Sequence, residues 1–380
     1  MFLKLGAMSY GGSAMLGIMQ AEIAERRQWL SNEQYLEGVG LVNMLPGPPA
    51  VQLAIFIGYH RCGWRGGILA GVCFMLPAFL ILLGLTLIYS AYGAVSAVQG
   101  ALYGMGSVVL AIFAAAVYRL GRTALQQPAH MAIAIAAALF AATATVGVAT
   151  TLLLAACAGV ALPHSRVRGL AAALVVVALV ALGHFVFPAT DAALLHGANP
   201  GHTATGATLP QLAGIFLKIG ALTFGGGLAM LALVQEQVVN QMHWLTSREF
   251  LDGLALGQLT PGPTLMIAAY VGYKAAGVPG ATVSAMAMFL PAFVMMLCLL
   301  PVLERFRHLR WIKPAMNGVS AAVIGCLLVT LLQLLPHAAP DRLSIAALIM
   351  VAIVLCRWRL PPLPIIAVAA LIGIAVHVTR

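Results

Sequence analysis

Two Pro-Gly-Pro triplets are the residues of this sequence with the most direct chemical consequence. They are Pro46-Gly47-Pro48 and Pro261-Gly262-Pro263, and both lie inside long apolar stretches. Proline lacks an N–H group and clashes with the preceding helical turn, so two prolines around a glycine break a helix. The N–H groups that follow such a break carry partial positive charge and can bind an anion. We therefore predict an anion-binding break at each triplet, with a structural hinge as the alternative.

Further candidates for anion binding lie close to these triplets or at a second pair of glycine motifs. A motif of one aromatic residue and two glycines occurs as Tyr10-Gly11-Gly12 and as Phe224-Gly225-Gly226. It predicts either a second helix break or close helix packing, because small residues let membrane helices approach. Neighbouring polar side chains could add hydrogen bonds at the triplets, and these are Asn43, Gln258, Thr260 and Thr264.

Charged residues at matching places suggest two further roles. Lys4 and Lys218 each follow Phe-Leu, and they could face the pathway as fixed positive charges for an anion or anchor the chain at the membrane interface. Glu22 and Glu236 lie near the ends of predicted spans, where a carboxylate is a candidate for proton coupling.

Other classes of chemistry find no support in the sequence. The six cysteines show no paired spacing of the kind found in metal sites or disulfide frameworks, so we expect no metal. Zinc-helix, nucleophile-elbow and P-loop signatures are missing, so we expect no enzyme and no cofactor. The net charge of +10 comes from basic residues at the ends of spans, which is typical of membrane topology and not of nucleic-acid binding.

The motifs belong to a repeat. Residues 2–79 and 216–293 share Phe-Leu-Lys, the aromatic-Gly-Gly motif, Trp-Leu, Pro-Gly-Pro, Gly-Tyr and Leu-Pro-Ala-Phe in the same order. Such self-similarity marks a duplicated architecture. Matching interruptions by Gly and Pro in two apolar halves point to the substrate site of a transporter.

The composition defines the fold class, because 62% of the residues are hydrophobic and only 8% are charged. We predict an all-α polytopic membrane protein of about 13 transmembrane segments, with helices broken at Pro-Gly-Pro. The expected parts are an N-terminal repeat at 1–165, a linker span at 166–209 and a C-terminal repeat at 210–380. Each broken segment is expected to cross once, although a re-entrant hairpin is the competing interpretation.

Loop charges predict the orientation of the halves. The loop at 91–97 is free of charge, whereas its counterpart at 304–313 is strongly basic. Because cytoplasmic loops are rich in Lys and Arg, the halves prefer opposite orientations. We therefore predict an inverted repeat.

The combined pattern, present twice, resembles the chromate ion transporter family in its two-domain form. That resemblance implies an exporter of chromate in a bacterial inner membrane, with the glycine and proline motifs as the implied positions. One departure is that Pro49-Ala50-Val51 is apolar where the family commonly has polar residues, which favours Thr260 and Thr264 as substrate contacts.

The sequence thus predicts a multi-pass secondary transporter that exports chromate, a divalent tetrahedral oxyanion. Uptake of sulfate or another small anion is the alternative, and a membrane scaffold is a third hypothesis from another class. The expected partners are the oxyanion, the lipid bilayer and a second copy in a homodimer, with no nucleic acid.

Overall fold

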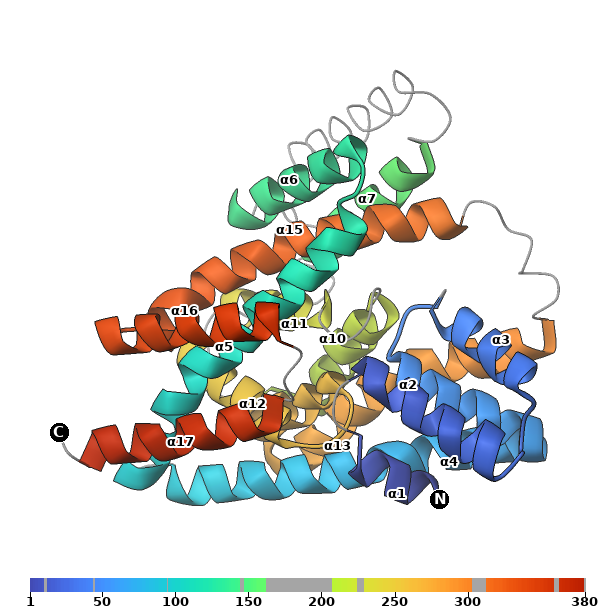
Figure 1. Cartoon of the computed structure of the whole chain (residues 1–380), viewed down its shortest axis with the longest axis horizontal. Coiled ribbons are helices and arrows are strands. Elements are labelled where there is room, and N and C mark those ends of the chain that lie inside the picture. The colour runs from blue at the N-terminus through green and yellow to red at the C-terminus, as the bar shows by residue number, and fades with distance from the viewer. Residues whose placement is uncertain are drawn as a thin grey trace.

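The computed structural model of the chain describes residues 1–9, 12–43, 45–93, 95–143, 147–161, 207–223, 229–302, 312–358 and 362–378. These residues form helices joined by short connections and contain no strand (Figure 1). The first half contains α1 (Phe2–Ala7), α2 (Gly12–Gln20), η1 (Ala21–Arg26), α3 (Asn32–Val42), α4 (Pro49–Tyr92), α5 (Ser96–Ala124), α6 (Pro128–Thr143) and α7 (Val148–Ala161). The second half contains α10 (Leu209–Ala221), α11 (Ala229–Gln235), η3 (Glu236–Gln241), α12 (Ser247–Leu259), η4 (Thr264–Met266), α13 (Ile267–Leu299), η5 (Leu300–Val302), α15 (Ile312–Ala338), α16 (Arg342–Arg357) and α17 (Pro362–Val378).

The duplication seen in the sequence is confirmed in local structure. Both η1 and η3 are π-helical turns, and each is followed by a residue with φ of 52°, Gln28 in one half and His243 in the other. The next helix then begins with a capping box in both halves, at Ser31 and at Thr246. Side chains that satisfy the first N–H groups fix where such a helix begins.

Each Pro-Gly-Pro triplet reverses the direction of the chain. In the first half, a Cβ atom added at Gly38 of α3 would lie 2.7 Å from Cε1 of Phe56 in α4. In the second half, Lys274 of α13 forms an ion pair of 2.8 Å with Glu249, at the start of α12. The two arms therefore run antiparallel. The prediction of a single discontinuous crossing is wrong, because the arms fold back as a hairpin with the triplet at its tip.

A second reversal ends each hairpin. Gly63 inside α4 has φ of 59° and Gly277 inside α13 has φ of 64°, a left-handed conformation that favours glycine. These turns divide α4 into arms at 49–61 and 64–92, and α13 into arms at 267–275 and 278–299. The first arms are about 20 Å long at most, at 1.5 Å per residue, which is shorter than a bilayer core.

The long second arms of α4 and α13 cross each other in antiparallel directions. A Cβ atom at Gly67 would lie 3.0 Å from Cδ2 of Leu297, and one at Gly71 would lie 2.5 Å from Cζ of Phe293. As the residue number rises from 67 to 71 in α4, that of the contacted residue falls from 297 to 293 in α13, so the two helices run in opposite directions. The long second arms of the two halves are therefore antiparallel where they cross.

The remaining helices exchange partners between the halves. α5 of the first half packs against α16 and α17 of the second, and α15 of the second half packs against α6 and α7 of the first (Figure 1). The closest approaches are equivalent, with Gly104 against Ala369 and Gly318 against Ala155. Small residues permit such approaches in membrane proteins. The two sequence repeats are therefore interlocked in space.

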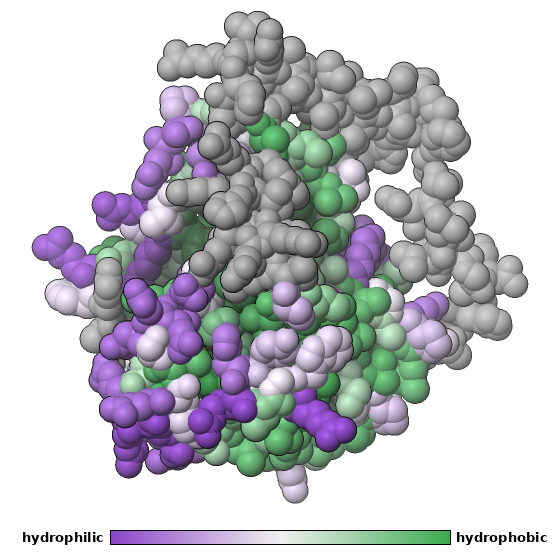
Figure 2. Space-filling view, turned by 90° about the vertical axis from the view of Figure 1, so that its right-hand side faces the viewer, coloured by the Kyte–Doolittle hydropathy of each residue, from purple (hydrophilic) through white to green (hydrophobic). Residues whose placement is uncertain are grey.

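Four helical segments of the described chain are long and apolar enough to cross a bilayer, at 49–92, 96–124, 264–298 and 314–338. Four shorter apolar helices accompany them, at 128–143, 148–160, 209–221 and 362–375. Hydrophobic residues also cover much of the visible described surface in Figure 2. The chain is therefore a multi-pass helical membrane protein. The expectation of about 13 segments is not confirmed, and the linker span predicted between the repeats lies outside the described residues.

We expect Gly104→Ala to destabilise the protein, because the added Cβ atom would clash with the carbonyl oxygen of Ala369. Overpacking of this kind costs about 1–3 kcal/mol. The measurement is the thermal unfolding of the purified protein in detergent. Gly84→Ala is the matched control, since a Cβ atom there meets nothing within 4 Å. Equal melting temperatures for both variants would contradict the helix exchange.

Candidate functional site

The two hairpin tips are tied to the opposite halves by reciprocal hydrogen bonds. The N–H group of Gly47 donates to the carbonyl oxygen of Thr223 at 2.6 Å, and that of Gly262 donates to the carbonyl oxygen of Ser9 at 2.7 Å. Ser9 and Thr223 are equivalent, and each directly precedes an aromatic-Gly-Gly motif. Each hairpin tip therefore contacts the residue that precedes the aromatic-Gly-Gly motif of the other half.

Only glycine fits the centre of each triplet. Gly47 has φ of +127° and Gly262 has φ of +132°, where a side chain is strained. A Cβ atom at Gly47 would lie 3.1 Å from Cβ of Ala292, and one at Gly262 would clash with Cβ of Ala78. Both alanines belong to the Leu-Pro-Ala-Phe motifs, so each tip packs against that motif of the other half.

These contacts place the tips at mid-depth of the apolar body. Ala78 lies near the middle of the second arm of α4, and Ala292 lies within the equivalent arm of α13. A broken backbone at this depth must be buried in protein or line a cavity, because hydrocarbon offers no hydrogen bonds. The tips meet that requirement through Ser9 and Thr223.

The helix N-termini behind the tips differ in the N–H groups that they leave for a ligand. In the first half, the N–H groups of Val51 and Gln52 both donate to the carbonyl oxygen of Pro48. Pro49 has no N–H group, so Ala50 is the one residue of this helix start whose N–H group is left for a ligand. Of the first three residues after the triplet in the second half, only Met266 donates its N–H group within the described part of the protein, to the carbonyl oxygen of Pro263.

The second half therefore offers two N–H groups, those of Thr264 and Leu265, where the first offers one. Helix N-termini of this kind attract anions. The role of the Thr264 side chain as a substrate contact stays a prediction. The N–H groups of Gly47 and Gly262 themselves are used within the protein and are not available to an anion.

Gln52 is a site residue that sequence reasoning missed. Its side chain is fully buried, and Nε2 donates to the carbonyl oxygen of Pro46 at 2.6 Å. Its Oε1 atom is buried and has no hydrogen-bond donor in the described structure. A lone glutamine four residues beyond the triplet, in an otherwise apolar run, was the available signal.

The other polar candidates occupy varied positions. Thr260 is buried and its hydroxyl donates to the carbonyl oxygen of Leu256 at 2.9 Å, while Gln258 is half-buried and Asn43 is exposed at the end of α3. Gly12 is the first residue of α2. Three predicted residues lie outside the described part of the chain, namely Gly11, Gly225 and Gly226.

The charged candidates do not gather at the tips. Lys4 and Lys218 are exposed at the last turns of α1 and α10. Glu22 forms ion pairs with Arg27 at 2.7 Å and with Arg26 at 3.2 Å. The hydrogen bond from Arg27 lowers the pKa of this exposed carboxyl, which lies outside the candidate membrane-spanning helices. The role of Glu22 in proton coupling stays a prediction.

Glu236 lies at the edge of a small polar pocket. Its carboxylate accepts hydrogen bonds from Asn240 at 2.8 Å and from Gln241 at 3.1 Å. Gln235 and Gln333, which are joined by a hydrogen bond of 3.0 Å, line the same pocket. Its role in proton coupling stays a prediction.

A second polar cluster joins the halves at the base of the second hairpin. Tyr89, at the end of α4, donates a hydrogen bond of 3.0 Å to Asp252 of α12. The Lys274 ammonium lies 5.6 Å from the centre of the Tyr89 ring, and Arg248 lies 3.6 Å from the Asp252 carboxylate. Asp252 is only 6% exposed, so these contacts offset the cost of burying its charge.

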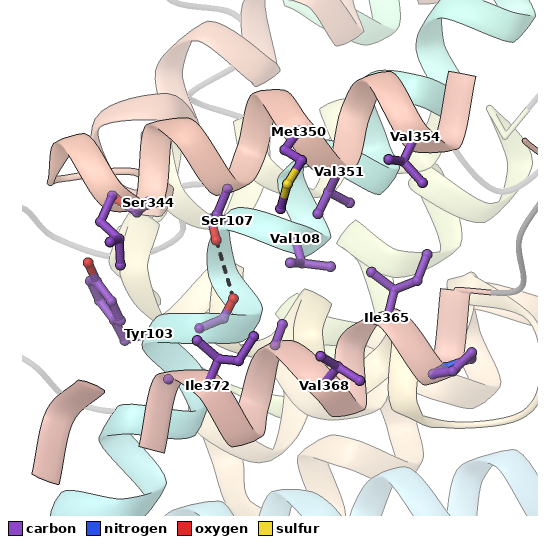
Figure 3. A pocket seen from close by; sticks show the side chains of 16 residues that line it. Tyr103, Ser107, Val108, Ser344, Met350, Val351, Val354, Ile365, Val368 and Ile372 are labelled. Carbon is purple, nitrogen blue, oxygen red and sulfur yellow. Dashed lines mark hydrogen bonds between the residues drawn. The ribbon is translucent and has the colours of Figure 1, made fainter. Parts of the chain in front are cut away.

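An apolar cavity on the second-half side of α5 does not suit an anion. It measures about 480 Å³ and lies between α5, α16 and α17 (Figure 3). Its walls are apolar apart from three hydroxyls, which already donate within the protein: Tyr103 to Asp341, Ser107 to Gly104 and Ser344 to Asp341. Among the described residues, no group of three His, Cys, Asp or Glu side chains could hold a metal ion.

Two repeats that exchange helices, each with a broken helix packed against the long arm of the other, define a duplicated membrane protein. Transporters hold their substrate at broken helices of this kind. The sequence model of the family described as chromate transporter matches residues 1–162 and 210–374. The chain belongs to this family.

Named relatives agree with that assignment. A chromate transport protein of Cupriavidus metallidurans is 32% identical, over 99% of this chain and 92% of its own. A probable chromate transport protein of Synechococcus elongatus is 32% identical, over 98% and 93%. A chromate transport protein of Pseudomonas aeruginosa is 32% identical, over 88% and 79%. No solved structure matches the chain.

We expect Gly262→Ala to lower stability by about 1–3 kcal/mol, through strain at positive φ and the clash with Ala78. Adding Ala78→Gly removes the clash but not the strain, so it restores part of the melting temperature. Gly257→Ala is the control, because a Cβ atom there has open space. If Ala78→Gly gave no recovery, the tip would not pack against α4 as described.

Tyr89→Phe removes the hydroxyl that donates to buried Asp252. Leaving a buried acceptor without its donor costs about 1–3 kcal/mol, so we expect a lower melting temperature. Tyr92→Phe should leave it unchanged, because Tyr92 is exposed on the same helix. A Tyr89→Phe variant as stable as the parent protein would contradict the buried link.

Proposed function

We propose that the chain is a secondary transporter that exports chromate across a bacterial inner membrane. Membership of the chromate transporter family supports chromate as the cargo. The observation that carries the mechanism is the crossed pair of hairpin tips at mid-depth, with helix N-terminal N–H groups left over behind them. Such groups replace the hydration of an oxyanion without a buried positive charge.

The antiparallel crossing of α4 and α13 supports an inverted repeat. If both long arms span the bilayer, the two hairpins enter from opposite faces and their tips meet near the middle. This arrangement gives the bound anion an equivalent route to each side. Alternating access then follows from closing one route while the other opens.

The moving unit in this proposal is not a sequence half. Because α5 packs with α16 and α17, and α15 packs with α6 and α7, the halves cannot rock apart as whole bodies. The hairpins move together with α4 and α13 against two groups of three helices. One group is α5 with α16 and α17, and the other is α15 with α6 and α7. The contact of Tyr89 with Asp252 holds the base of the second hairpin closed.

The membrane potential favours export. A dianion that leaves a negatively charged cytoplasm gains about 4.6 kcal/mol for each 100 mV, twice the value for one charge. No nucleotide is then required. The predicted homodimer plays no part in this mechanism and stays a prediction of the sequence.

The test is chromate flux into inside-out vesicles that contain the protein, with excess sulfate as the competitor. We expect saturable uptake that depends on the membrane potential. Uptake that sulfate competes away completely would favour the sulfate alternative. Correctly inserted protein without any flux would rule out chromate transport.

Two substitutions at Thr264 separate its hydroxyl from its N–H group. Thr264→Val keeps the N–H group, whereas Thr264→Pro removes it and reproduces the Pro49 of the first half, at a helix position where proline is tolerated. We expect the proline variant to bind chromate about tenfold more weakly, as the loss of one hydrogen bond to a charged group predicts. The valine variant should match the parent protein, and equal uptake by both variants would exclude the N–H group from binding.

A further inference from the structure

The Gln52 amide lies at the tip of the first hairpin. The side chain folds back from α4, so that Nε2 reaches the carbonyl oxygen of Pro46 and would lie 2.7 Å from a Cβ atom at Gly47. Its Oε1 atom is a buried acceptor without a donor. A buried acceptor of this kind is satisfied by a water or by a ligand that carries a proton.

The orientation of the amide follows from its partner. An amide oxygen placed 2.6 Å from the Pro46 carbonyl oxygen would bring two acceptors together, which is repulsive. The nitrogen therefore faces Pro46, and the oxygen is the buried atom that is left without a donor among the described residues. This position adds an acceptor to a site that otherwise presents N–H donors.

We propose that Gln52 Oε1 accepts a hydrogen bond from the protonated oxygen of the bound anion, so that hydrogen chromate is the species carried. The proposal rests on the proposed function and deepens it. Chromate takes up its last proton near neutral pH, whereas sulfate does so only in strong acid. N–H donors alone cannot tell chromate from sulfate, because the two anions share shape and charge. An acceptor in the site favours an anion that carries an O–H group over one that does not.

The difference between the halves fits this ligand. The second half is one residue shorter between the triplet and Gly-Tyr, and counted back from Gly-Tyr, Met266 stands at the place of Gln52 and offers no comparable acceptor. In this proposal the acceptor acts together with the N–H group of Ala50 on its own hairpin and with those of Thr264 and Leu265 on the other hairpin. Hydrogen chromate has the matching set, with one hydroxyl and three oxygens that accept.

Titratable groups on the surrounding elements lie away from the tip. On α4, His60 is eight residues from Gln52, about 12 Å along the helix, and it interacts electrostatically with Glu37 of α3. On α13, Lys274 is paired with Glu249 at the base of the other hairpin. The other charged side chains of α1, α3 and α10 are exposed: Lys4, Glu33 and Lys218.

The transport step balances one proton and one negative charge. Chromate binds a proton on the cytoplasmic side, crosses as hydrogen chromate, and releases the proton on the other side. In inside-out vesicles, uptake therefore acidifies the lumen. In mildly alkaline buffer, where free chromate stays unprotonated, transport of the bare dianion would leave the lumenal pH unchanged, whereas proton exchange would make the lumen alkaline.

The experiment follows chromate uptake and lumenal pH in inside-out vesicles, in mildly alkaline and mildly acidic buffers and with sulfate as competitor. It compares the parent protein with Gln52→Met, which installs the residue of the second half. Ser284→Ala is the matched control, because Ser284 also carries a buried oxygen without a partner and the first half has Ala70 there.

We expect the parent protein and Ser284→Ala to acidify the lumen and to take up chromate faster in acidic buffer. Gln52→Met should lose the pH dependence and show a preference for chromate over sulfate that is about tenfold smaller. Parent protein that carries chromate without acidifying the lumen would overturn the proposal and leave the proposed function intact. Absence of chromate uptake by the parent protein would instead refute the proposed function.

Discussion

A bilayer core gives an unpaired backbone group no partner, and this constraint governs how the two broken helices are held. Each Pro-Gly-Pro tip satisfies its glycine N–H group with a carbonyl oxygen of the other half, Thr223 for Gly47 and Ser9 for Gly262. Neither half contains the acceptor that its own tip uses. The close packing of each glycine on an alanine of the opposite long helix, and the crossing of α4 with α13, both bring these donors and acceptors together.

Duplication supplied one backbone twice, and later divergence gave the two copies different chemistry. The hairpins share their turns, their π-helical entry and their capping boxes. Their tips differ, because Pro49 and Gln52 in the first half stand where the second half has Thr264 and Met266. Two hairpins of the same backbone therefore end in different tips, of which the first has a buried acceptor and the second has more N–H groups without a partner in the described structure.

The sequence predicted the repeat, the helical membrane class and the breaks at Pro-Gly-Pro, because these follow from local residue types. It left open whether the chain crosses or turns back there, since a break ends a helix without setting the direction of the next one. That direction depends on distant contacts, such as Lys274 with Glu249.

The exchange of helix partners was hidden for a related reason. The two repeats present the same small residues, so Gly104 could have packed in its own half, against Ala155, as readily as against Ala369. Gln52 was overlooked because its neighbours made the run appear uniformly apolar.

The exchanged helices also impose an order on biosynthesis. α5 is made early, but its glycine face is covered by α17, a helix of the second half that is made much later. Until the second half is made, the face of α5 that α17 covers stays open, and the N–H group of Gly47 lacks its acceptor on Thr223. The first half therefore cannot complete its packing before the second half is made, and the insertion machinery or the lipids must shield the early helices in the meantime.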